Sequence, residues 1–116
     1  MRQFTKVSLE IVFEPRAGLL CTVVWVAGSY DAANAGELEA ALGGVARAGD
    51  VVVDMSRVSF ADASVLRVLD RASRTLGAEG RRFGVRGPSR NVERLLEICG
   101  MTAWVTDADE LEHCCA

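Results

Sequence analysis

The stretch of sequence that most constrains the fold reads VVVDMSRVSFADASVLRVLDRA and covers residues 51–72. Residues 51–55 form a short run rich in β-branched side chains, with Asp54 as its one charged exception, and such a run is typical of an interior strand. From Val65 the apolar residues recur at three and four positions, while arginines and an aspartate occupy the other side, which predicts an amphipathic helix. The stretch therefore predicts a strand that leads directly into a helix.

The residues upstream of this stretch predict a hairpin and a first helix. Alternate residues of 7–13 are apolar, and Pro15 and Gly18 supply turn residues before the apolar run 19–27. This pattern is typical of two strands joined by a short turn. Apolar residues then repeat with a helical period, so we expect a helix over roughly 32–48.

Downstream, each element has a recognisable start or end. Phe83 and Val85 predict a short strand, and Pro88 and Ser89 are suited to opening a third helix. Gly100 follows the last apolar position of that helix, where a residue with a left-handed backbone commonly ends a helix. We expect this third helix to be amphipathic, with its apolar side in the core.

The last part of the chain predicts one more strand and a final helix. We expect the strand at 102–105, followed by a helix capped by Asp107, with Glu110 completing a capping box. The resulting order β-β-α-β-α-β-α-β-α predicts an α/β fold with a mixed sheet of about five strands covered by helices. Because no linker composition interrupts this order, residues 1–116 are expected to form a single domain.

Charge and hydropathy argue against several classes of partner. The net charge is −3 and both signs are interspersed, so the sequence offers no basic stripe for nucleic acid. The apolar run 19–27 is far shorter than the ~20 residues that a membrane span requires. The N-terminal residues alternate in polarity instead of forming the apolar core of a signal peptide, so we expect a cytoplasmic protein. From the charge and the short apolar run, we expect no nucleic-acid and no membrane partner.

The sequence contains no recognisable catalytic or metal-binding motif. A phosphate-binding GxxxxGK[ST] loop and a GxSxG nucleophile turn are both lacking, and His113 is the one histidine. Cys21, Cys99, Cys114 and Cys115 show no metal-ligand spacing. We therefore expect a protein that is not an enzyme and that needs no cofactor and no metal.

The junction between the strand and the helix at 58–66 is the most informative candidate site. Asp62 and Ser64 are both residue types that cap helices, so one of them can cap while the other is left in the first turn. If Asp62 caps, a phosphate on Ser64 would lie beside the unsatisfied N–H groups and the positive dipole end of the helix. An ordinary helix-start serine would have the same local sequence, so the junction alone does not establish phosphorylation.

The chain resembles the STAS family, specifically the bacterial anti-sigma factor antagonists, over about residues 19–111. Five ordered segments carry this resemblance: VAGSYDAANA (26–35), VVVD (51–54), VSFADAS (58–64), VRGPS (85–89) and LLEICGM (95–101). The family pattern Asp-Ser-Ser-Gly corresponds here to Asp62-Ala63-Ser64-Val65, with valine in place of glycine.

The resemblance implies a function and a set of site residues. It implies that Ser64 accepts a phosphate and that Asp31, Asp62, Ala63, Ser64 and Val65 belong to the partner-binding surface. The implied partner is an anti-sigma factor that is also a serine kinase of the ATP-binding, histidine-kinase-like type, so ATP belongs to that partner. Unphosphorylated protein would bind this partner and release a sigma factor, and phosphorylation at Ser64 would end the binding.

Two other functions remain open from the residues. The chain could be a non-phosphorylated STAS module, acting as a constitutive antagonist or as a subunit of another signalling or transport assembly; the valine beside Ser64 favours this reading. Redox control could instead act if Cys114 or Cys115 pairs with Cys99, which requires the two bridged Cα atoms to lie within about 7 Å. The sequence does not predict an oligomeric state.

Overall fold

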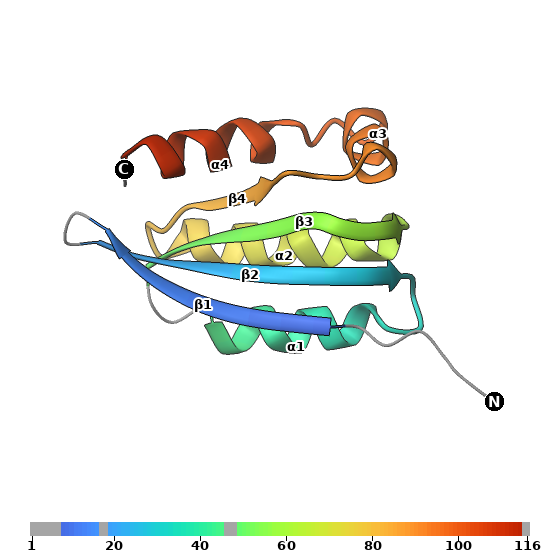
Figure 1. Ribbon diagram of the computed structural model, residues 1–116, viewed down its shortest axis with the longest axis horizontal. Helices are drawn as coiled ribbons and strands as arrows, with labels where there is room; N and C mark the ends of the chain where they lie inside the picture. Colours follow the sequence, from blue (N-terminus) through green and yellow to red (C-terminus); the bar gives the residue numbers. More distant parts are fainter. Residues whose placement is uncertain (1–7, 17–18, 46–48, 115–116) are drawn as a thin grey trace.

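The computed structural model of the 116-residue chain describes residues 8–16, 19–45 and 49–114 (Figure 1). The strands and helices occur in the following order: β1 (Ser8–Arg16), β2 (Leu19–Tyr30), α1 (Ala35–Val45), β3 (Asp50–Ala61), α2 (Ala63–Ala78), β4 (Phe83–Arg86), α3 (Arg90–Ile98) and α4 (Ala103–Cys114). The expected hairpin and the strand-to-helix junction are both present. Helix α1 begins later than expected because residues 31–34 form a turn, and residues 46–48 lie outside the described part.

The described strands form one mixed sheet in the order β1-β2-β3-β4. Strands β1 and β2 are antiparallel, whereas β2, β3 and β4 run parallel to one another. Each parallel connection passes through a helix, since a parallel pair cannot be joined by a tight turn. The mixed α/β fold is therefore confirmed, although the described residues form four strands and not about five.

The core lies on both faces of β3. Val51 and Val53 belong to the large apolar cluster that includes the buried residues of α1 and α2, whereas Val52 clusters with Ala108 and Leu111 of α4. Successive strand residues point to opposite faces, so this division places α4 across the sheet from α1 and α2. Figure 1 shows α2 behind β3 and α4 alongside β4. The sequence-based prediction of an interior strand at 51–55 is confirmed.

Asp54 of β3 is a buried acid, with 5% of its surface exposed. Its Oδ2 accepts a hydrogen bond from Nε of Arg86 at 2.9 Å, and its Oδ1 accepts one from the Ser56 hydroxyl at 2.6 Å. Burial raises the pKa of Asp54, but the hydrogen bonds from Ser56 and Arg86 outweigh this effect and leave the pKa below its usual value. Arg86 also lies over the ring of Trp25, 4.7 Å from its centroid. Arg86 of β4 therefore links β3, through Asp54, and β2, through Trp25.

The strand expected at 102–105 is wrong, because the chain enters α4 at Ala103. Trp104, Ala108 and Leu111 recur with a helical period and are all buried. Trp104 also packs edge-on against Phe83, with ring centroids 5.5 Å apart. Asp107, expected to cap this helix, lies inside it, so the apolar period of the whole segment outweighs the local cap signal.

Gly84 of β4 allows α4 to approach the sheet closely. A Cβ atom at this position would lie 2.6 Å from the backbone nitrogen of Ala108 and 2.7 Å from its Cα. Backbone atoms of a helix cannot move aside as the end of a flexible side chain can. Glycine at position 84 is therefore required by the packing of α4, independently of its backbone conformation.

We expect Gly84→Ala to destabilise the fold by about 1–3 kcal/mol, since the added methyl group must displace α4. Gly77→Ala is a matched control, because no atom lies within 4 Å of the Cβ added there, in α2. This control should be neutral or stabilising, by at most about 1 kcal/mol. Urea unfolding of the two variants measures the difference, and equal stabilities would contradict the proposed packing constraint.

Candidate functional site

The parallel pairing of β2 and β3 brings two chain segments together at one edge of the sheet. Ser29 pairs with Phe60, and Tyr30 pairs with Ala61, in the last residues of the two strands. Asp31 follows β2 directly and Asp62 follows β3 directly, so both acids leave the sheet at the same edge. We call this region the carboxyl edge and define it by Ser29, Asp31, Phe60, Asp62, Ala63 and Ser64.

Asp31 is exposed and is held by a compact turn before α1. Its Oδ1 accepts a hydrogen bond from the backbone N–H of Ala33 at 2.9 Å. In return, the backbone N–H of Asp31 donates to Oδ1 of Asn34 at 2.8 Å. Asn34 also donates through Nδ2 to the carbonyl oxygen of Ser29 at 2.8 Å, which ties the turn to the end of β2. The position of the Asp31 carboxylate is therefore fixed by local hydrogen bonds.

Asp62 caps α2, as the sequence predicts. Its backbone is extended, and its Oδ1 accepts a hydrogen bond from the backbone N–H of Ser64 at 2.9 Å. The Ser64 hydroxyl donates a short hydrogen bond to the same oxygen. One carboxylate oxygen thus receives both the N–H and the O–H of Ser64, and it holds the hydroxyl in the first turn of the helix.

These hydrogen bonds favour the ionised form of Asp62. The hydroxyl of Ser64 is the largest cause that lowers the pKa of Asp62 below its usual value, and backbone N–H groups of Ser64 and Val65 lower it further. Desolvation of the carboxyl group, the second-largest cause, acts in the opposite direction and is outweighed. The carboxyl edge therefore presents a charged Asp62 at neutral pH.

The four residues from Asp62 to Val65 differ sharply in exposure. Ala63 is exposed and Ser64 is partly exposed, so both lie at the surface of the carboxyl edge. The Val65 side chain is 0% exposed and belongs to the large core cluster. The expectation that Val65 contributes its side chain to a partner surface needs correction, because the valine that replaces glycine points into the core and leaves Ser64 uncovered.

Side chains from three elements hold the end of β3. Ser59 Oγ lies 3.0 Å from Ser29 Oγ, which joins β3 to β2 across the edge. Ser89, at the start of α3, donates its hydroxyl to the carbonyl oxygen of Val58 at 2.6 Å. Asn91 of α3 donates through Nδ2 to the carbonyl oxygen of Ser59 at 3.1 Å. The backbone immediately before Phe60 is therefore bonded to the start of α3, and the Ser59 side chain is bonded to β2.

Phe60 is a candidate site residue that the sequence analysis missed. Half of its surface, 50%, is exposed, although it lies in a strand between a polar residue and a buried alanine. The pairing of β2 with β3 shifts register between Gly28 and Ser29, and this irregularity interrupts simple alternation near Phe60. The one available signal was the position of an aromatic residue two places before a helix cap.

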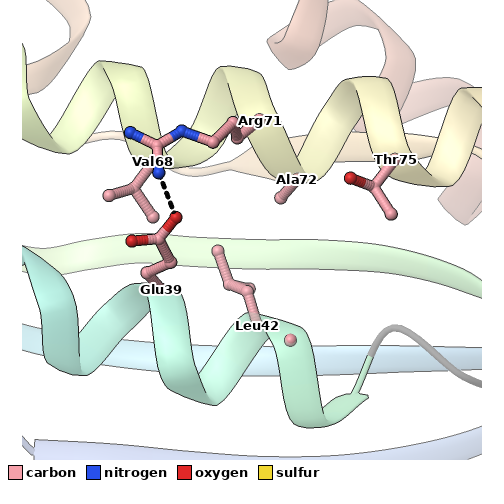
Figure 2. Close-up of a pocket in the computed structure, with 7 residues that line it drawn as sticks. Glu39, Leu42, Val68, Arg71, Ala72 and Thr75 are labelled. Carbon is pink, nitrogen blue, oxygen red and sulfur yellow. Dashed lines mark hydrogen bonds and ion pairs between the residues drawn. The ribbon is translucent and has the colours of Figure 1, made fainter.

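A groove of about 160 Å³ between α1 and α2 lies away from these residues (Figure 2). Arg71 of α2 reaches across it and donates through Nη1 to Oε2 of Glu39 in α1 at 2.5 Å. Leu42, Val68 and Ala72 provide much of the remaining lining. This arrangement pairs the charges and joins two helices, and it offers no nucleophile next to a base among the groove's lining residues.

Cys99 and Cys114, two of the candidate redox cysteines, lie far apart in the structure. Cys99 has a free, exposed thiol just after α3. Cys114 is the last residue of α4, a helix of 12 residues that begins only four positions after Cys99. Such a helix is about 18 Å long, and Figure 1 shows α3 beside the start of α4, away from the last turn of α4. A Cys99–Cys114 disulfide is therefore incompatible with this fold, and Cys115 lies outside the described residues.

The described part of the chain lacks both a metal-binding cluster and a membrane-spanning helix. Within it, no cluster of three or more histidine, cysteine, aspartate or glutamate residues is arranged to hold a metal ion. No helix among the described residues has the length and apolar content needed to cross a membrane.

The structure is a small α/β domain with a mixed sheet. Its parallel strands β2 and β3 lead into the turn that contains Asp31 and into the helix capped by Asp62. The chain belongs to the STAS-domain family, because the family model described as "Mlab, STAS domain" matches residues 15–107. This result confirms the family resemblance of the sequence. No curated protein matches the chain by sequence.

Solved structures with the same fold include anti-sigma factor antagonists. One from Mycobacterium paratuberculosis is 28% identical, with a TM-score of 0.68, and the match covers 84% of this chain and 83% of that chain. The unphosphorylated form of SpoIIAA is 20% identical, with a TM-score of 0.71 and coverages of 86% and 85%. The phosphorylated Bacillus SpoIIAA is 18% identical, with a TM-score of 0.67 and coverages of 93% and 98%. At these lower identities, the two SpoIIAA matches establish the fold.

We expect Asp62→Ala to destabilise the domain by about 1 kcal/mol, because α2 loses its N-cap acceptor. Asp62→Asn is the matched control, since an asparagine side chain caps about as well as aspartate and should retain most of the stability. Chemical denaturation compares the variants with the parent chain. A loss that is equally large in Asp62→Asn would show that charge, and not capping, stabilises this helix start.

The Ser64→Ala variant should raise the pKa of Asp62 toward its usual value, because the largest stabiliser of the ionised form is removed. Ionised Asp62 stabilises the fold above its unfolded-state pKa, and this contribution is lost as the pH falls through the lower folded-state value. Ionised Asp62 should therefore stabilise the Ser64→Ala variant less at neutral pH, and the free energy of unfolding should fall less as the pH is lowered. Carboxyl NMR titration measures the pKa, with Ser73→Ala in the same helix as the control, for which no change is expected.

Proposed function

We propose that this chain is an anti-sigma factor antagonist whose binding surface is the carboxyl edge. In this proposal the unphosphorylated chain binds an anti-sigma factor and thereby releases a sigma factor. The anti-sigma factor is also a serine kinase, which uses its own ATP to phosphorylate Ser64 and so ends the complex. The chain itself acts by binding and not by catalysis.

The observation that carries this proposal is the position of the Ser64 hydroxyl. Ser64 is partly exposed at the start of α2, its hydroxyl is bonded to Asp62, and it lies on the same edge as the exposed Asp31. A kinase that docks on this edge would find the acceptor oxygen already oriented by the helix cap. Burial of Val65 supports access to this oxygen, because its branched side chain does not lie over the serine.

Phosphorylation at this position has a direct electrostatic consequence. The serine oxygen would lose its proton to become a phosphate ester, so it could no longer donate to Asp62. The phosphate would add a charge of about −1.5 to −2 beside an ionised carboxylate. The first-turn N–H groups of α2 and the helix dipole could accommodate this charge, which leaves the helix folded. A partner surface that fits the neutral hydroxyl and the two acids would meet a larger and more negative group.

The matched structures support an antagonist function in general terms. They are described as anti-sigma factor antagonists, and SpoIIAA occurs among them in unphosphorylated and phosphorylated forms. The second candidate function is a STAS module that is not phosphorylated, working as a constitutive antagonist or within another signalling or transport assembly. The family model, described as "Mlab, STAS domain" and not as an antagonist, favours this alternative.

The decisive experiment mixes the purified chain with each anti-sigma factor kinase encoded in its own genome, with and without ATP. Mass spectrometry then locates phosphate, and calorimetry measures binding. We expect one kinase to bind the chain without ATP, to phosphorylate Ser64 with ATP, and to release the phosphorylated product. Ser64→Ala should bind and remain unmodified, whereas Ser64→Asp should bind at least about tenfold more weakly, a loss of about 1.4 kcal/mol.

Ser73→Asp provides the matched control, because Ser73 belongs to the same helix but lies away from the carboxyl edge. This variant should bind as the parent chain does. Tight binding of an anti-sigma factor without any phosphate on Ser64 would favour the constitutive antagonist. If the chain binds none of the anti-sigma factors, the antagonist function is overturned.

A further inference from the structure

The described part of the chain exposes two large apolar side chains. Phe60 is 50% exposed and Ile98 is 74% exposed, and the other large apolar residues of known burial are less exposed. Single exposed apolar residues are common on protein surfaces and need no explanation by themselves. The surroundings of Phe60, and not its exposure alone, distinguish it from Ile98.

Phe60 lies in the middle of the carboxyl edge. It pairs with Ser29 at the end of β2 and stands two residues before the Asp62 cap. The next residue, Ala61, is buried, so the chain returns to the core directly after the exposed ring. Phe60 therefore lies two residues before Asp62, on the strand paired with the one that leads into Asp31.

The backbone that carries Phe60 is held in place before any partner binds. The carbonyl oxygens of Val58 and Ser59 accept hydrogen bonds from Ser89 and Asn91 at 2.6 and 3.1 Å. The Ser59 hydroxyl lies 3.0 Å from that of Ser29. A ring on such a backbone loses little conformational entropy on binding. Aromatic side chains, phenylalanine included, are enriched in the buried centre of protein interfaces.

The acids that follow β2 and β3 restrict the chemistry of the partner. Asp31 is exposed, and Asp62 is ionised at the cap of α2. An apolar pocket with an acidic rim would face two like charges, whereas a rim of lysine or arginine would complement them. Complementary charges outside an apolar centre are a common arrangement in protein interfaces.

We infer that Phe60 is the apolar anchor of the carboxyl edge and inserts into a pocket on the anti-sigma factor that is bordered by lysine or arginine side chains. This inference rests on the proposed antagonist function and adds the residue that supplies most of the affinity, together with the chemistry of the surface it contacts. Asp31 and Asp62 raise the rate of association with the partner, and the Phe60 ring, once inserted in the pocket, slows dissociation of the complex.

The experiment measures binding kinetics of Phe60→Ala, with the anti-sigma factor that binds the parent chain as the probe. We expect Phe60→Ala to weaken binding about 30-fold, mainly through faster dissociation. Ile98→Ala is the matched control, because it removes a similarly exposed apolar side chain about 10 Å along α3 from Asn91. Circular dichroism and urea unfolding of both variants show whether each retains the fold.

A second variant tests the charged border of the pocket. Asp31→Asn preserves the acceptor for the Ala33 N–H and removes the charge, so we expect slower association, with a smaller dependence on salt. Equal affinities for the parent chain and a folded Phe60→Ala would overturn the inference and leave the antagonist function standing. An unchanged association rate in Asp31→Asn would overturn the cationic border. A parent chain that binds no anti-sigma factor would overturn the proposed function together with this inference.

Discussion

Parallel pairing of β2 with β3 requires the chain to cross from one end of the sheet to the other before the second strand begins. Helix α1 makes this crossover, and α2 makes the next one from β3 to β4. Both strands consequently finish at the same edge, where Tyr30 is paired with Ala61. Every feature of the carboxyl edge depends on this register, because a slip by one residue would exchange buried and exposed side chains along β3.

Local signals were sufficient to predict much of the fold. The β-branched run at 51–55 and the helical period after Val65 are strong patterns, and the structure contains β3 and α2 at these places. The final segment was harder, since residues 102–105 are few and include Trp104 and Val105, which are common in strands. The contacts of Trp104 with Phe83, and of α4 with Gly84, determine the helix there. These contacts join distant parts of the sequence, so no short window contains them.

The candidate site shows the same division between local and tertiary information. The cap formed by Asp62 and the adjacent Ser64 could be predicted, because both residues lie within one turn of the same helix. Asp31 could be predicted as a site residue only from the family resemblance. The β2–β3 register is what brings it to the same edge as Asp62. The exposure of Phe60 depends on an irregularity in that register, and the burial of Val65 depends on how α2 meets the sheet. Neither property could be obtained from residue type alone.

The bonding of Ser64 to Asp62 also determines how large a structural change a modification of this serine would cause. One carboxylate oxygen receives the N–H and the O–H of the same residue, and an ester on the hydroxyl would remove only the second of these donors. The helix would keep a capping bond in both chemical states, so neither state requires part of the domain to unfold. The two forms would then differ in surface charge and not in backbone shape, and interconversion would proceed at the rate of the modifying enzymes, without a slow refolding step.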